Sequence, residues 1–151
     1  MHWVRYWWPA LLWAAVISIA SMRWFSSEHT GHTIFPILSW LFPHASFATL
    51  ELIHHLIRKS GHVFEYAIFS LLVLRGFRAG RSGWSWGWAA YTIVIVACYA
   101  GLDEFHQLFV PGRGASVWDS ALDTAAGAAA LLLAWMVISW RESRGADTQQ
   151  Y

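Results

Sequence analysis

Three long stretches of this chain carry no charged side chain, and their length constrains the fold more than any other feature. They lie at residues 6–22, 82–102 and 124–140, and none of them contains Asp, Glu, Lys or Arg. A helix that crosses the hydrocarbon core of a bilayer needs about 20 mostly apolar residues, within a range of about 17–25. The three stretches therefore predict three membrane-spanning helices.

A fourth apolar stretch includes ionisable side chains. Residues 62–77 are mostly aliphatic or aromatic, but they contain His62, Glu65 and Arg75. A helix here reaches spanning length only if His62 and Glu65 lie in or near the membrane. With this helix, the sequence predicts an all-α polytopic membrane protein. It is a bundle of four transmembrane helices at about residues 6–25, 60–77, 85–107 and 118–140.

The composition agrees with a chain that faces lipid. Only 13% of the residues are charged, against about 25% in an average soluble domain. Most of the twelve tryptophans fall near the ends of the predicted spans, as in an interfacial belt. The net charge of +1 with scattered basic residues argues against a nucleic-acid partner. The single cysteine, Cys98, excludes a disulfide framework.

The segments outside the four spans have their own predictions. Residues 26–46 form an external connection, in which Ile34 to Phe42 is too short to cross the membrane and is expected to be interfacial or re-entrant. A helical pattern starts at about Phe47 and can continue into the second span. Residues 1–140 then form one transmembrane domain, and residues 141–151 form a polar cytoplasmic tail. Ser18 and Ala20 leave open a cleaved signal peptide, although an uncleaved anchor fits the length better.

Lys and Arg near the span ends predict the orientation. With four crossings and a cytoplasmic N-terminus, six arginines are cytoplasmic, and they are Arg5, Arg75, Arg78, Arg81, Arg141 and Arg144. Four basic residues are then external, namely Arg23, Arg58, Lys59 and Arg113. We therefore expect a multi-pass protein of the bacterial cytoplasmic (inner) membrane with both termini inside.

Three clusters of polar side chains interrupt the apolar pattern. The first is Arg58, Lys59, His62, Glu65 and Tyr66; the second is Asp103, Glu104, His106 and Gln107; the third is Arg113, Ser116, Asp119 and Asp123. They lie at the start of the second span, the end of the third and the start of the fourth, which face the same side of the membrane. The clusters are therefore predicted to meet at one depth, although Asp119 alone could simply cap a helix.

The same clusters resemble a known family. The strings Arg58-Lys59-x-x-His62-x-x-Glu65-Tyr66, Asp103-Glu104-x-x-Gln107 and Pro111-Gly112-Arg113-x-x-Ser116-x-x-Asp119, in that order, are similar to the VanZ-like family of small bacterial membrane proteins. The resemblance covers about residues 58–130. It implies a cell-envelope context and a link to low-level teicoplanin resistance, but no reaction. Many members carry Asn at the position of Asp123, so no obligatory charge is expected there.

The leading functional hypothesis is a non-catalytic envelope protein. Its external polar site binds the headgroup of an anionic membrane lipid or of a lipid-linked cell-wall precursor. Arg58, Lys59 and Arg113 pair with phosphate in this hypothesis. The remaining predicted ligand-binding residues are His62, Tyr66, Gln107 and Ser116.

Two alternatives stay open. The first is an intramembrane hydrolase or transferase on a lipid-linked substrate, with Glu65 or Glu104 as general base. A divalent cation, Mg²⁺, Ca²⁺ or Mn²⁺, could accompany it, because carboxylate-rich sites without cysteine suit hard cations. Its predicted ligands are Asp103, Asp119, Asp123 and His62. The second is a proton-coupled carrier assembled as an oligomer. Carboxyls outnumber cations in the three clusters, which favours shared protons or a bound cation.

Overall fold

The fold is known from a computed structural model, which describes residues 3–21, 27–110 and 115–147. These residues form five α-helices and no strand. The helices are α1 (Val4–Ala20), α2 (Ser27–Leu41), α3 (Phe47–Arg78), α4 (Trp86–Gln107) and α5 (Val117–Asp147). The prediction of an all-α protein is confirmed.

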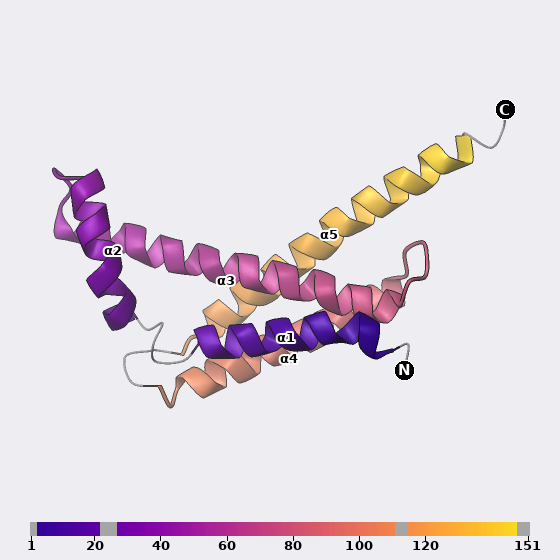
Figure 1. Cartoon of the computed structure of the whole chain (residues 1–151), viewed down its shortest axis with the longest axis horizontal. Helices are drawn as coiled ribbons and strands as arrows, with labels where there is room; N and C mark the ends of the chain where they lie inside the picture. The colour runs from indigo at the N-terminus through magenta and orange to yellow at the C-terminus, as the bar shows by residue number, and fades with distance from the viewer. Residues whose placement is uncertain (1–2, 22–26, 111–114, 148–151) are drawn as a thin grey trace.

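Four of the helices run lengthwise and alternate in direction. Figure 1 shows α1, α3 and α4 side by side and α5 crossing them at an incline, with the start of α1 and the end of α5 toward the same end. The long α3 is central, since it packs against α1, α4 and α5. This antiparallel order agrees with the predicted succession of spans.

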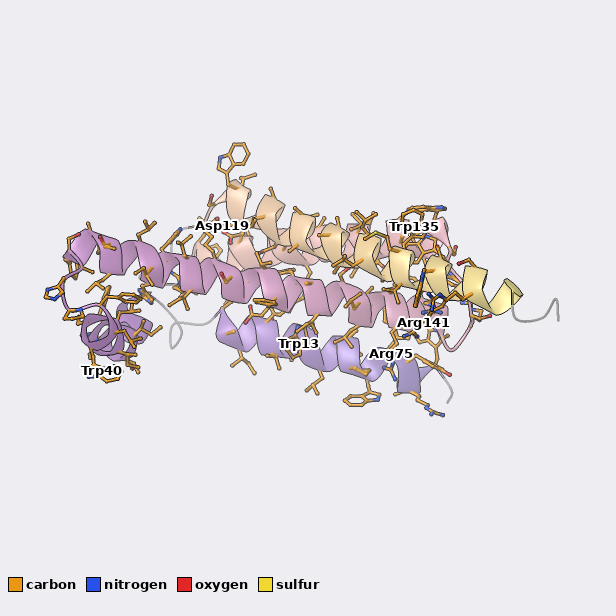
Figure 2. All side chains as sticks on the ribbon, turned by 90° about the horizontal axis from the view of Figure 1, so that it is seen from above. Trp13, Trp40, Arg75, Asp119, Trp135 and Arg141 are labelled. Carbon is orange, nitrogen blue, oxygen red and sulfur yellow. The ribbon has the colours of Figure 1, made fainter. Side chains whose placement is uncertain are left out.

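The second helix is longer than the predicted interfacial segment. It begins at Ser27, before Ile34, and continues through Pro36 to Leu41. It crosses the start of α3 beyond the ends of α1, α4 and α5 in Figure 1, and it is seen end-on in Figure 2. Phe35 of α2 stacks on Phe47 of α3 with ring centroids 5.5 Å apart. The segment is therefore helical over both its polar and its apolar part, and it does not run alongside the bundle.

The third helix also extends far beyond the predicted span of 60–77. Its 32 residues correspond to about 48 Å at 1.5 Å per residue, whereas the hydrocarbon core is about 30 Å thick. The side chain of Ser46 caps its first turn by accepting a hydrogen bond from the Thr49 backbone N–H at 3.2 Å. The helix ends where Ala79 and Gly80 adopt left-handed φ values of 46° and 82°.

The surface of the bundle is apolar, while several polar side chains are buried. Large exposed side chains include Leu11 and Leu12 of α1, Val94 of α4 and Leu133 of α5. Buried polar side chains, by contrast, are Ser21, His54, Ser70, Thr92, Asp103, Glu104, Gln107 and Asp123. Such an arrangement is typical of a protein surrounded by lipid.

Two helices of the described residues are long and apolar enough to cross a membrane, namely α4 and α5 up to Arg144. The first helix, α1, is apolar but shorter. The polar tail predicted from residue 141 is helical as far as Asp147, where α5 ends. Lengths and composition thus indicate a membrane protein, and the crossing of α1 and α3 remains a prediction.

Candidate functional site

A cluster of polar side chains, most of them ionisable, lies where α3, α4 and α5 meet, and we call it the polar site. Its members on these helices are Lys59, Glu65, Tyr66, Asp103, Glu104, Gln107, Asp119 and Asp123. Each of the three sequence clusters contributes to it, as their common depth predicts. Figure 2 shows Asp119 far from Arg75 and Arg141, which lie toward the opposite end of the bundle.

Lys59 joins α3 to α5 at the edge of the polar site. Its Nζ donates to Oδ1 of Asp119. The two side chains keep 31% and 32% of their surface exposed, so the pair lies at the rim. Asp119 also interacts electrostatically with Arg58, while burial lowers the pKa of this arginine. Both described basic residues that were predicted to bind phosphate are therefore already beside a carboxyl.

Asp103 joins α4 to α1. It is 7% exposed, and its Oδ2 accepts a hydrogen bond from Ser21 Oγ at 2.8 Å and another from Gln107 Nε2 at 2.9 Å. Gln107 lies one turn after Asp103 on the same helix, so it orients the carboxyl. Ser21 follows directly after α1 and is completely buried.

Glu104 anchors the start of α5. Its Oε2 accepts a hydrogen bond from the backbone N–H of Ser116 at 2.7 Å. Ser116 immediately precedes α5, where unpaired N–H groups favour a negative partner. This contact uses the backbone of Ser116, whereas the sequence predicted a ligand-binding role for this residue. Arg113, the third predicted phosphate ligand, lies outside the described residues.

Two further members of the polar site are almost inaccessible. Asp123 is 2% exposed and Tyr66 is 0% exposed. Asp123 interacts electrostatically with Tyr66, Asp103 and Glu104. Tyr66 Oη has no hydrogen-bond partner among the residues that the structure describes. A buried hydroxyl without a partner is costly, and this one lies beside carboxyls.

His62 and Glu65 form a looser contact on the α3 side of the polar site. His62 Nδ1 lies 3.8 Å from Glu65 Oε2, one turn along the helix. The backbone of Glu65 also holds α1, since Trp13 Nε1 donates to its carbonyl oxygen at 2.9 Å. The hydrogen bond from Trp13 thus ties this part of α3 to α1.

A small cavity opens beside Asp103 between α1 and α4. It measures about 180 Å³ and is lined by Ser18, Tyr99, Leu102, Asp103 and His106. Tyr99 Oη donates to the Ala14 carbonyl at 2.6 Å and lies 2.7 Å from Ser18 Oγ. The two hydroxyls on the wall are therefore mutually satisfied, and Asp103 is the carboxyl that the cavity exposes.

The predicted metal ligands do not form a recognisable metal centre. Within residues 3–21, 27–110 and 115–147, no three His, Cys, Asp or Glu side chains are arranged so that they could hold a metal ion. Asp103 and Asp119 instead bind Ser21 and Lys59. Their role as ligands of a divalent cation stays a prediction, as does that of Asp123 and His62.

The sequence did not predict that α1 contributes to the polar site. Ser21 and Ser18 lie one turn apart at the end of the first apolar stretch, and Tyr99 lies one turn before Asp103. Serine is common within apolar helices, because its hydroxyl can bond to the backbone of the preceding turn. The pattern alone therefore gave no sign that α1 completes the polar site.

Comparison with known proteins gives one match. The sequence profile of a family described as VanZ/LLP1 matches residues 6–139. No curated protein and no solved structure matches this chain. The match includes the first apolar stretch and the connection before α3, which carry no distinguishing motif, as well as all described parts of the polar site.

Proposed function

The chain belongs to the VanZ/LLP1 family, and on that premise we propose that it is a cell-envelope membrane protein whose polar site binds a lipid-linked headgroup. The bound molecule is a membrane lipid or a lipid-linked cell-wall precursor. One observation carries the proposal: a buried carboxyl, Asp103, faces a cavity between two helices whose outer surfaces are apolar. A ligand that reaches this cavity from the bilayer has a polar end and an apolar chain.

The size of the cavity supports a headgroup rather than a whole ligand. Pockets that enclose drug-sized molecules measure about 300–1,000 Å³, and this cavity measures about 180 Å³. It accepts a small polar group, while the chain of an amphiphile stays between α1, α4 and the surrounding lipid.

The chemistry of the polar site refines the ligand class. Lys59 already contacts Asp119, so phosphate has to compete for it. Carboxyls accept hydrogen bonds, and Tyr66 Oη supplies a donor that is unpartnered within the described chain. We therefore propose that the site recognises hydroxyl, amide or amine groups of the headgroup, as a sugar or peptide carries. This differs from the simple capture of an anion by Arg58 and Lys59.

The proposed orientation places the polar site near the outer leaflet. Arg75, Arg78 and Arg81 lie at the opposite end of the bundle (Figure 2 labels Arg75), toward the start of α1 and the end of α5. An excess of arginine at one end is typical of the cytoplasmic side. With four crossings, the polar site then faces the leaflet in which cell-wall precursors are used, which fits the teicoplanin link implied by the family.

Two tyrosine variants test the proposal. Tyr66→Phe removes only the unpartnered hydroxyl, so the empty protein should stay as stable or become more stable. Binding of a polyprenyl-linked disaccharide-peptide precursor in lipid nanodiscs should weaken about two- to tenfold, the usual effect of one hydrogen bond. Tyr91→Phe is the matched control, because Tyr91 is 63% exposed and does not line the cavity. It should leave binding unchanged.

Other results would contradict the proposal or change it. Unchanged binding in Tyr66→Phe removes its hydroxyl from the site, and no binding by the wild-type protein contradicts the proposal as a whole. Conversion of the bound precursor to a product assigns the site to the hydrolase or transferase hypothesis. Glu65→Gln and Glu104→Gln then decide which carboxylate is the base.

A further inference from the structure

A groove lies at the end of the bundle that carries Arg75, Arg78 and Arg81. We call this end the arginine end. The groove measures about 390 Å³ and runs between α3 and α5, beside Tyr6 of α1. Its volume is within the range of ligand sites. The polar site described above lies toward the other end, so the two sites share no described residue.

The three arginines of this groove differ in their existing contacts. Arg81 is occupied: its Nε donates to the Arg78 carbonyl at 3.1 Å and its Nη2 to the Phe77 carbonyl at 2.7 Å. Its guanidinium also lies 4.7 Å from the ring centroid of Trp88. Capping of the last carbonyls of α3 is an ordinary role for a basic residue at a helix C-terminus, so Arg81 needs no ligand.

Arg78 and Arg75 are not explained by capping. The Nε atom of Arg78 is buried and has no hydrogen-bond partner within the described part of the chain. Arg75 makes one long hydrogen bond, from Nη1 to the Tyr6 carbonyl at 3.4 Å, and a guanidinium offers five N–H donors. A buried donor without a partner is costly. Both side chains therefore retain donors for a ligand in the groove that they line.

The charge of the groove indicates which chemical group it can bind. No ion pair in the described chain involves Arg75, Arg78 or Arg81, and Glu142 of α5 lies instead against Gly83 in the following loop. Guanidinium groups bind phosphate through paired hydrogen bonds. The groove thus presents unneutralised positive charge and suits a phosphate.

The floor of the groove defines the rest of the ligand. Leu71 lies one turn before Arg75 on α3 and Leu74 one turn before Arg78, and Ala134 and Ile138 of α5 line the same groove. A phosphate held by the arginines therefore has an apolar channel directly beneath it. A soluble phosphate compound leaves this channel empty, whereas the acyl chains of a lipid fill it.

We infer that the groove between α3 and α5 binds an anionic phospholipid, with its phosphate on Arg78 and Arg75 and its acyl chains against Leu71, Leu74, Ala134 and Ile138. Basic pockets between transmembrane helices on the cytoplasmic side hold anionic headgroups in this way. The lipid joins α3 to α5 and fixes the arginine end on one face of the membrane.

Native mass spectrometry of the purified full-length protein tests this site with phosphatidylglycerol and phosphatidylcholine as probes. The wild-type protein should retain phosphatidylglycerol more strongly than phosphatidylcholine. Arg78→Gln and Arg75→Gln should each weaken the retention of phosphatidylglycerol by at least about tenfold, as expected for loss of a charged hydrogen bond. Arg141→Gln is the matched control: it removes the same charge from the same end (Figure 2), but from an exposed side chain outside the groove. It should retain the lipid as the wild type does.

Several results would overturn the inference. Equal retention of the two lipids shows that the arginines do not select an anionic headgroup. An equal loss in Arg141→Gln shows that only bulk charge acts. Displacement by glycerol 3-phosphate as effective as displacement by the lipid shows that the acyl chains contribute nothing. If Arg78→Gln folds poorly, the site is tested by the shift in melting temperature that phosphatidylglycerol causes in Arg75→Gln. A shift as large as in the wild type contradicts the site.

Discussion

The hydrogen bond between Ser21 and Asp103 gives the sharpest test of how α1 belongs to the polar site. Ser21→Ala removes the donor 2.8 Å from Asp103 Oδ2 and leaves Gln107 as the other donor to that oxygen. The side chain of Ser21 is completely buried, so water does not replace it readily. The variant should loosen the contact between α1 and α4.

The magnitude follows from two measured scales. Hydrogen bonds to charged groups contribute about 1.5–3 kcal/mol in soluble proteins, whereas bonds between membrane helices average about 0.6 kcal/mol and reach about 1.7 kcal/mol. A buried carboxyl with two donors belongs at the upper end of the second scale. We therefore expect Ser21→Ala to lower the free energy of unfolding by about 1–2 kcal/mol.

A double-mutant cycle with Asp103→Ala, which removes the acceptor, isolates the contact. Unfolding is measured on purified protein in detergent micelles, and Ser60→Ala, at an exposed serine of α3, serves as control and should change stability by less than about 0.5 kcal/mol. A coupling energy below about 0.5 kcal/mol, or equal effects of Ser21→Ala and Ser60→Ala, would refute the reasoning.

Two more predictions concern packing and pH. A Cβ at Gly76 meets the Trp7 ring at 2.8 Å, whereas a Cβ at Gly61 has no neighbour within 4 Å. Gly76→Ala should therefore be about 1–3 kcal/mol less stable than Gly61→Ala, the usual cost of overpacking, and equal unfolding energies would contradict this. His54 packs on Phe35 of α2 with ring centroids 5.2 Å apart, and burial lowers its pKa from the ordinary 6.5. The unfolded form then binds more protons, so the α2–α3 contact should weaken as the pH falls below about 6.5. Hydrogen exchange of α2 at two pH values checks this, and equal protection after correction for intrinsic rates would speak against it.

The sequence predicted much of the polar site because its residues follow helical spacing. Lys59 and Tyr66 lie two turns apart on one face of α3 with Glu65 beside them, and the clusters on α4 and α5 come at the matching ends of apolar stretches. Antiparallel order then brings them together. The function of these residues is a separate question, and it stays a prediction.

Other features depend on contacts between helices, which the sequence pattern does not encode. Ser21 resembles any serine in an apolar helix until α1 is packed beside Asp103. The polar residues from Ser27 onward looked like a loop, yet they continue into the helix that packs on α3. The extension of α5 to Asp147 was missed for a different reason, because charged residues do not by themselves end a helix.

The central claim is that the polar site holds the headgroup of a lipid-linked molecule. An experimental structure of the protein, purified with its native lipids, tests it most directly. The account predicts density for a headgroup in the cavity beside Asp103, lined by Ser18, Tyr99 and His106, and continuous with a chain that passes between α1 and α4. A cavity that contains only water, in a sample that retains bound lipid elsewhere, would contradict it.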